Sequence, residues 1–446
     1  MNIIIAGDGE VGFHLAEMLE SEDHDITIVD PNSELLEMLG SHSDVMTITG
    51  NSTSIKVLKE AKIEKADLLI SVVHNETVNL VTCMLGKQLG AKRTIARINN
   101  VDYLNPENKI HFKKLGVDAL VCPERIAAKE ILKLLSNSAA TEITDFSDGK
   151  LSLYLIRLDQ KALVLGKTLS QIATEYPNLN FRCIAIYRKG KTIIPSGNDH
   201  FEVGDLSYVI TKPDGVKNLH KLGGKKKLDI QNVMIIGGGR IGRKTARELE
   251  KKVNVKLIDI DKNRCEHLTD NIRNTLIING DSRDVNLLED EGIRDMDAFI
   301  AVTNNSETNI FNCLLAKEYG VPKVIPSIEN VDYFDIAKNI GIDTIINKKL
   351  ITASYIFRFT LDEKILDIKC LSGIDAEAYE FIVKEKAPAT KKPIKKLKIP
   401  EGAIIGGIVS NNISYIAIGD TQIKAGDRVV VFALPKANKK VRTLFI

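Results

Sequence analysis

The sequence has no tryptophan and only 5% aromatic residues, and its 61 basic and 59 acidic residues leave a formal net charge of +2. With no global positive field and few rings to stack on bases, the composition does not favour a nucleic-acid-binding protein. The longest apolar stretches, such as 232–236 and 429–434, are far shorter than the roughly 20 residues that span a bilayer. Any membrane role is therefore expected to be peripheral.

The six cysteines form neither a CxxC pair nor a metal-ligand spacing. This pattern is typical of structural thiols in a reducing compartment, and we expect Cys83 and Cys313 to be core residues of helices. The opening segment MNIIIAGDGEVG enters an expected strand at once and has no basic region, so no signal peptide is expected.

The sequence does contain an internal duplication with a period of about 230 residues. Three pairs of segments carry it: IIIAGDGEVG (3–12) with MIIGGGRIG (234–242), TITGNSTSIKVL (47–58) with IINGDSRDVNLL (277–288), and VVHNETVNLVTCMLGKQLGAK (72–92) with VTNNSETNIFNCLLAKEYGVPK (302–323). The segments recur in the same order, which chance composition does not produce.

Each copy begins with short apolar runs that alternate with helical patterns. In the first copy the expected strands are 2–6, 26–30, 45–49, 68–72, 94–98 and 119–121, and two of the expected helices are 11–20 and 78–89. Such alternation predicts an α/β fold with a doubly wound parallel sheet. Short alternating runs separated by Gly and Pro turns follow, with a Gly-Asp turn at 204–205 and at 426–427, and they predict a small β-rich α+β domain.

We therefore expect four domains, at 1–140, 141–225, 230–350 and 360–446, in which a parallel-sheet domain and a small β-rich domain occur twice. The segment HKLGGKKKLD at 220–229 is the expected linker. The basic segment at 384–398 is interpreted as a solvated loop, and contact with anionic lipid is the alternative for both segments.

A GxGxxG motif directly follows the first expected strand and opens a helix. Its residues are Gly7, Asp8, Gly9, Glu10, Val11 and Gly12. The glycines allow the tight turn, the approach of a pyrophosphate and close helix–strand packing, and the helix N-terminus favours the phosphates. Asp30 ends the second strand, where its carboxylate can accept from ribose hydroxyls and would repel a 2′-phosphate. NAD is thus favoured over NADP.

The second copy repeats this arrangement with Gly237, Gly238, Gly239, Arg240, Ile241 and Gly242, and with Asp259 as the carboxylate. Asp261 adds another carboxylate two residues later. In both copies the alternative is that the glycines serve only strand–helix packing.

Other candidate residues follow the later strands, at the edge where an open α/β sheet binds its ligand. They are Asn51, Val73, His74 and Arg97 in the first copy and Asp281, Thr303 and Asn304 in the second. His74 is interpreted as a polar contact and not as a general base, because its counterpart is Asn304. Arg97, whose counterpart is Ser327, either binds phosphate oxygens or forms a structural ion pair.

Two glycine-loop units, each followed by a small β-rich domain, resemble the TrkA family of bacterial Trk potassium-uptake subunits, built of tandem RCK (KTN) modules. The motifs that carry the resemblance are both GxGxxG–Asp sites, TGNST, NGDSRD, VTNNSETN and the GKTL…PSG…EVGD pattern at 166–205. A departure is expected in the last domain, where Ile405-Gly406-Gly407-Ile408 stands for GKTL.

This resemblance implies a regulator that is not an enzyme. It would bind NAD or NADH at the residues above and lie peripherally on the cytoplasmic face of the membrane. It would also form a homo-oligomeric ring, such as a tetramer of tandem chains, under a membrane-embedded potassium-transporting subunit. Two alternatives stay open. ATP or ADP would fit a ribose-binding aspartate equally well, and a nicotinamide-dependent dehydrogenase would need a proton-transfer group that the β-rich domains do not display.

Overall fold

The computed structural model describes the whole chain except residues 8–9, 21–23, 43, 138–139, 177–179, 217, 220–222, 225–227, 331, 343, 361–364 and 371–375, and it leaves out the side chains of 10, 17, 20, 38, 41–42, 335 and 365–370. The chain divides into two compact units. The first comprises Met1–Glu130 and Asn347–Thr360, and the second comprises Ile131–Ile346 and Leu361–Ile446.

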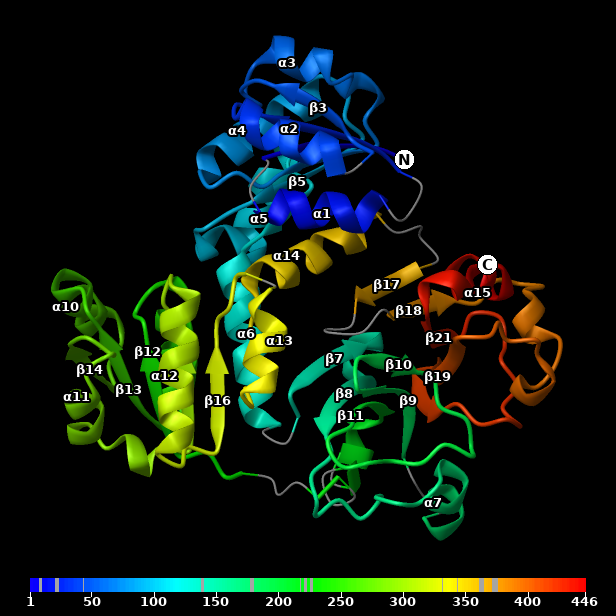
Figure 1. Cartoon of the computed structure of the whole chain (residues 1–446). Helices are drawn as coiled ribbons and strands as arrows, with labels where there is room; N and C mark the ends of the chain where they lie inside the picture. The colour runs from blue at the N-terminus through cyan, green and yellow to red at the C-terminus, as the bar shows by residue number, and fades with distance from the viewer. Residues whose placement is uncertain are drawn as a thin grey trace. The chain divides into compact units, whose positions relative to one another are not determined.

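The first unit contains a six-stranded parallel sheet in the order β3-β2-β1-β4-β5-β6 (Figure 1). Its strands are β1 (Asn2–Ala6), β2 (Asp25–Asp30), β3 (Met46–Thr49), β4 (Leu68–Ser71), β5 (Arg93–Arg97) and β6 (Ala119–Val121). The helices are α1 (Glu10–Glu20), α2 (Ser33–His42), α3 (Ile55–Glu60), α4 (Glu76–Gln88), α5 (Pro106–Lys114) and α6 (Pro123–Ser136), the last running beyond the unit.

This sheet confirms the predicted doubly wound fold, and every strand ends within one residue of its predicted bounds. The strands were recognisable because helices cover both faces of such a sheet, so that β4, for example, is buried at all four positions. The strand order reverses between β1 and β4, which is where open α/β sheets place a ligand crevice.

One helix from far along the chain also belongs to the first unit. α14 (Lys348–Phe357) follows the second parallel sheet in sequence but packs against α1. Thr352, Ala353 and Ile356 on α14 are buried. Nothing in the sequence pattern assigned this helix to the first copy.

The second unit contains another parallel sheet, ordered β14-β13-β12-β15-β16. Its strands are β12 (Asn232–Ile236), β13 (Asn254–Asp259), β14 (Thr275–Asn279), β15 (Ala298–Ala301) and β16 (Lys323–Pro326), and its helices are α9 (Arg240–Leu249), α10 (Lys262–Asn271), α11 (Val285–Asp290), α12 (Ser306–Glu318) and α13 (Tyr333–Asn339). Where the first sheet has β6, this sheet has a single parallel bridge between Ser327 and Ile346.

Two antiparallel sheets complete the second unit, ordered β10-β9-β11-β8-β7 and β17-β18-β21-β19-β20. The first consists of β7 (Glu142–Phe146), β8 (Leu151–Arg157), β9 (Phe181–Arg188), β10 (Lys191–Ile193) and β11 (Leu206–Thr211), with α7 (Leu169–Glu175). The second consists of β17 (Ile365–Cys370), β18 (Glu377–Ile382), β19 (Ala403–Ser410), β20 (Ile413–Ile416) and β21 (Arg428–Ala433), with α15 (Asn438–Phe445). These are the predicted β-rich domains.

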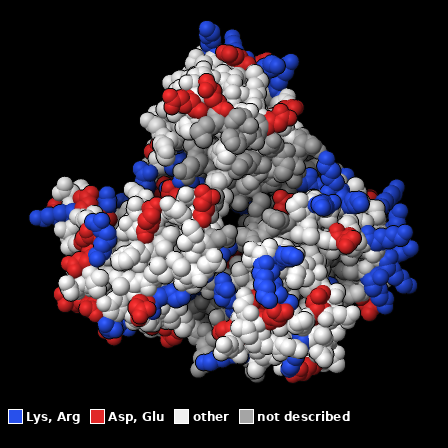
Figure 2. Space-filling model, in the orientation of Figure 1, with Lys and Arg blue, Asp and Glu red and all other residues white. Residues whose placement is uncertain are grey.

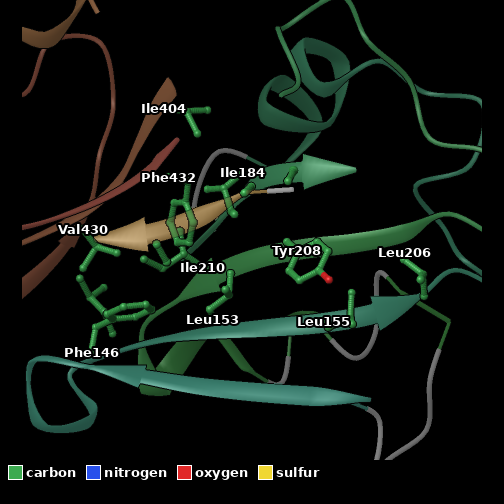
Figure 3. Close-up of a cluster of buried hydrophobic side chains, with 14 of the residues drawn as sticks. Phe146, Leu153, Leu155, Ile184, Leu206, Tyr208, Ile210, Ile404, Val430 and Phe432 are labelled. Atoms are coloured by element: carbon green, nitrogen blue, oxygen red, sulfur yellow. The ribbon is translucent and has the colours of Figure 1, made fainter. Parts of the chain in front are cut away.

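The two antiparallel sheets share one hydrophobic core (Figure 3). The ring of Phe146 meets that of Phe432 edge-on, with centroids 6.3 Å apart, and Tyr208 and Ile210 are fully buried beside them. Aromatic pairs of this geometry add to the stabilisation from area burial. The two β-rich domains therefore pack as a pair.

The structure corrects one alignment within the duplication. Gly406 and Gly407 lie inside β19, which pairs with β21, whereas the GKTL segment precedes α7. The two glycines serve the shared core: a Cβ on Gly407 would lie 2.7 Å from Leu151 Cδ1, and one on Gly406 would lie 2.8 Å from Phe432 Cε2. Tight sheet packing, and not a degenerate GKTL motif, accounts for this Gly-Gly pair.

Candidate functional site

The glycine loop of the first unit connects β1 to α1. Gly7 has φ 112°, which strongly favours glycine, and its N–H donates to the Val29 carbonyl at 3.0 Å. A Cβ on Gly12 would lie 2.0 Å from the Gly7 carbonyl oxygen, so the helix can approach the strand only with glycine there. Asp8 and Gly9 and the side chain of Glu10 lie outside the described residues. Val11 is buried.

The second unit repeats this loop between β12 and α9. Gly237 has φ 99°, and a Cβ on Gly242 would lie 1.9 Å from the Gly237 carbonyl oxygen. The space around Gly239, the N-cap of α9, is open, and no side chain caps this helix. Arg240 is exposed in the first turn of α9 and Ile241 is half-buried. A free helix N-terminus beside an open glycine suits the approach of a phosphate.

The predicted ribose carboxylates end the second strand of each sheet. Asp30 and Asp259 are both almost buried. Oδ1 of each accepts the N–H two residues later, from Asn32 at 2.9 Å and from Asp261 at 2.8 Å. Asp259 Oδ2 also accepts the Gly238 N–H at 2.6 Å, which ties the carboxylate to the glycine loop.

Arg264, which the sequence analysis did not single out, binds the second carboxylate. Its Nη1 donates to Asp259 Oδ1 at 3.0 Å and Oδ2 at 2.9 Å, and its Nη2 lies 3.3 Å from Asp261 Oδ2. Hydrogen bonding to Asp259 raises the pKa of Arg264. The position equivalent to Arg264 in the first copy is Leu35, an apolar residue. The sequence feature that could have identified Arg264 is a basic residue in the first turn of the helix that follows a strand ending in aspartate.

A buried asparagine in each unit links the ends of the fourth and fifth strands. Asn79 Oδ1 accepts from the Val73 N–H at 2.9 Å, and its Nδ2 donates to the carbonyls of Val73 and Arg97, each at 2.9 Å. This one side chain thus links the ends of β4 and β5. The predicted residue Val73 is thereby fixed through its backbone.

Asn309 has the same role in the second unit. Its Oδ1 accepts from the Thr303 N–H at 3.0 Å and hydroxyl at 2.7 Å, and its Nδ2 donates to the Ser327 carbonyl at 2.8 Å. The sequence analysis missed both asparagines, although each is the last polar residue of the recurring NETVN and NSETN segments.

The glycine loops and the fourth strands meet in both units. A Cβ on Gly7 would lie 3.0 Å from Val73 N, and one on Gly237 would lie 3.0 Å from Thr303 N. His74 and its counterpart Asn304 are both exposed at this edge, in matching burial patterns. Among the described residues, the His74 ring has no hydrogen bond or ion pair with a carboxylate.

Arg97 is buried at the end of β5, and its Nη2 lies 3.9 Å from Glu124 Oε1. Its Nε has no hydrogen-bond partner among the described atoms. The contact with Glu124 fits the ion-pair alternative, and the free Nε leaves a donor available. Arg97 as a phosphate ligand stays a prediction.

Asn51 and Asp281 close turns after the third strands. Asn51 Oδ1 accepts the Thr53 N–H at 2.9 Å, and Asp281 Oδ2 accepts from Arg283 Nη2 at 2.6 Å. The bond from Arg283 lowers the pKa of Asp281. Both side chains are thus engaged in their own turns.

Among the described residues, no helix is long and apolar enough to span a bilayer, and no group of His, Cys, Asp and Glu is placed to hold a metal ion. The described cysteines, by contrast, confirm an expectation. All five are buried, including Cys83 and Cys313 on α4 and α12, whereas the side chain of Cys370 lies outside the description.

Family models match nearly the whole chain. The TrkA-N domain matches residues 3–123 and 233–348, and the TrkA-C domain matches residues 153–222 and 378–446. The chain belongs to the TrkA family. Its tandem arrangement of both domains agrees with the predicted duplication and with the predicted resemblance.

Relatives in this family match over their full length. The Trk system potassium uptake protein TrkA homolog 1 of Methanosarcina mazei is 32% identical, and the alignment covers 100% of both chains. The Trk system potassium uptake protein TrkA of Haemophilus influenzae is 32% identical over 98% of this chain and 97% of its own.

Solved structures with this fold include the GsuK channel bound to NAD, with a TM-score of 0.61 and 19% identity over 100% of this chain and 78% of that one. The crystal structure of GsuK bound to ADP has a TM-score of 0.51 and 16% identity, covering 80% of this chain and 68% of that one. At these identities the likeness establishes the fold alone.

Proposed function

We propose that this chain is the nucleotide-binding regulatory subunit of a potassium-uptake system, and that it gates a membrane-embedded potassium-transporting partner without catalysing a reaction. The observation that carries the proposal is one arrangement that occurs in both copies. Each unit has a glycine loop in close contact with the fourth strand and a nearly buried aspartate at the end of the second strand. The relatives of this chain are named Trk system potassium uptake proteins, which supports a role in potassium uptake.

We assign NAD or NADH as the ligand. The glycine loop suits a pyrophosphate, and Asp30 and Asp259 stand where ribose hydroxyls would donate. The NAD-bound GsuK channel, which shares this fold, is consistent with that assignment.

ATP or ADP is the second candidate ligand. The aspartate would bind a ribose and the glycine loop would bind phosphates, and neither would contact the nicotinamide. GsuK has also been solved with ADP. Calorimetric titration of the full chain with NAD, NADH, ATP and ADP separates the candidates. Tighter binding of a dinucleotide supports the assignment, and binding of ATP or ADP alone would replace it.

A dehydrogenase would need a proton-transfer group oriented towards the nicotinamide. Among the described crevice residues, His74 is exposed and has no carboxylate partner, and its counterpart is an asparagine. We therefore expect no hydride transfer to a panel of carbonyl substrates with bound NADH. Substrate-dependent oxidation of NADH would contradict the regulatory assignment.

Ring assembly is the expected quaternary structure. Two pairs of duplicated positions are apolar and exposed in both copies: Val81 (37%) with Phe311 (50%), and Leu115 (53%) with Ile340 (44%). Apolar side chains exposed at equivalent positions of two units are typical of interfaces between such units. Phe311→Glu should lower the oligomeric state measured by light scattering, whereas Lys317→Glu on the same helix should not.

Attachment to the cytoplasmic face of the membrane is expected to be peripheral. Alkaline carbonate should release the protein from membranes, and retention in the membrane pellet would argue against peripheral attachment.

A further inference from the structure

A basic surface covers one side of the second β-rich domain. Its members are exposed or half-exposed side chains on the segment after β18 and on the segment that contains α15: Lys384, Lys386, Lys391, Lys392, Lys395, Lys396, Lys398, Lys436, Lys439, Lys440 and Arg442. Figure 2 shows blue side chains gathered where these segments lie in Figure 1. We call this set the basic face.

The two segments of the basic face are held together by the fold. The 3₁₀ turn at Pro388–Thr390 packs against α15, and the Lys384 N–H donates to the Phe445 carbonyl at 3.0 Å. A second 3₁₀ turn at Ile394–Lys396 is anchored by the buried Ile394. The lysines are thus displayed from a folded surface, close to one another.

Little acidic charge offsets this surface. Between 384 and 398 the only acidic residue is Glu385, and between 436 and 442 there is none. Lys395 pairs with Asp420, but Lys391, Lys392 and Lys396 have no carboxylate within ion-pair distance among the described side chains. The whole chain has a net charge of only +2, so the remainder of the protein is net acidic. Crowded like charges repel, and an anionic partner would relieve that repulsion.

The duplication provides an internal comparison. Leu158 and Val383 occupy equivalent places, because each accepts the N–H of the glycine and donates to the carbonyl of the aspartate in its Gly-Asp turn. From that anchor, 384–398 corresponds to 159–173, which has two lysines and one aspartate in place of seven lysines and one glutamate. Likewise, Lys436 stands where the first domain has Asp214. The basic face therefore belongs to the second domain and is not a general property of the fold.

We infer that the basic face binds the surface of an anionic phospholipid bilayer. Ten of its eleven cations are lysines, which suit a diffuse negative surface, whereas selective recognition of phosphate favours arginine. The basic face contains no aromatic side chain to stack on a base, and Phe445, the aromatic residue of α15, is buried. A lipid surface fits these features better than a nucleic acid. The contact goes beyond the proposed function, because it requires neither nucleotide nor a membrane subunit.

The test is sedimentation of the full chain with vesicles, either of phosphatidylcholine alone or of phosphatidylcholine and phosphatidylglycerol in equal parts. Binding is expected only to the anionic vesicles and should fall as salt is added, because salt screens exposed charges. Each lysine near an anionic bilayer strengthens binding about fivefold, so the triple variant Lys391→Glu, Lys392→Glu, Lys396→Glu should lose on the order of a hundredfold or more in affinity.

The matched control is Lys56→Glu, Lys59→Glu, Lys65→Glu, which changes the net charge equally at exposed lysines of the first unit. It should retain vesicle binding. Equal loss in both variants, or no binding of the unmodified chain to anionic vesicles, would overturn the inference. Binding of a mixed-sequence RNA without vesicle binding would also overturn it and would assign the face to nucleic acid. Failure of this vesicle test leaves nucleotide binding and gating untouched.

Discussion

The guanidinium of Arg264 donates to both carboxylate oxygens of Asp259, at 3.0 and 2.9 Å, and Asp259 is the residue that we propose as a ribose acceptor. The side chain of Arg264 is 44% exposed, while that of Asp259 is 3% exposed. The proposed second nucleotide site thus has an arginine on its aspartate, and the equivalent residue of the proposed first site is Leu35. The two sites differ in charge at the same position.

Replacing Arg264→Ala should strengthen binding of NADH at the second site severalfold, because the ribose no longer competes with a guanidinium for Asp259. The effect should be modest, since a partly exposed ion pair contributes about 0.2–1 kcal/mol. The reciprocal change, Leu35→Arg, should weaken the first site. Calorimetry measures both. Weaker binding by Arg264→Ala would instead place its guanidinium on a ligand phosphate.

Asp30→Ala should weaken dinucleotide binding at the first site about tenfold or more, because a hydrogen bond to a charged acceptor contributes about 1.5–3 kcal/mol. Circular dichroism checks that the variant is folded. Asp259→Ala is the matched variant and should affect only the second site. Unchanged first-site affinity in folded Asp30→Ala would remove Asp30 from the site.

The two sites should bind NADH with distinguishable affinities, and Arg97→Ser should weaken the tighter one. Glu124→Gln separates the two interpretations of Arg97, since it removes the charge paired with the guanidinium and keeps the guanidinium itself. If Arg97 binds phosphate, only Arg97→Ser should weaken binding. Two sites with the same affinity for NADH, both unaffected by Arg97→Ser, would contradict the prediction.

Asn79→Ala should destabilise the first unit, because it leaves the part-buried backbone groups of Val73, just after β4, and the buried carbonyl of Arg97 on β5 without this partner. Each such group costs about 1–3 kcal/mol, so thermal unfolding should begin several degrees lower. Asn108→Ala is the control, because it alters a half-buried asparagine whose side chain donates one solvent-exposed hydrogen bond, to the Asp102 carbonyl. Equal unfolding temperatures for the two variants would show that the hydrogen bonds of Asn79 to Val73 and Arg97 do not stabilise the first unit.

The buried thiols should resist alkylation at neutral pH. Burial raises the pKa of Cys83, Cys313 and, to about 12, Cys183, so the reactive thiolate is scarce. Iodoacetamide should modify these residues only after unfolding in guanidinium, as measured by mass spectrometry of digested protein. Rapid modification of Cys83 in the native protein would contradict its burial on α4.

The sequence by itself determined the duplication, the strands of the first parallel sheet and the placement of the glycine loops. Strands of a doubly wound sheet are buried on both faces and read as short apolar runs, and the loop glycines are required by local backbone conformation and helix–strand clearance. Gly7 and Gly12 could be recognised from the sequence because the constraints on them are local. Gly7 has a positive φ, and Gly12 must lack a Cβ to approach Gly7, five residues away.

Only the tertiary structure decided which side chains fill the site. Asn79 bonds to the ends of two strands, α14 packs on a helix more than 300 residues earlier, and Gly406 and Gly407 face the other β-rich domain. Arg264 could have turned to solvent or to Asp259, and the pairing followed from the position of α10 beside β13. Periodicity reports whether a residue is buried, but the identity of its partner depends on chain segments that meet only after folding.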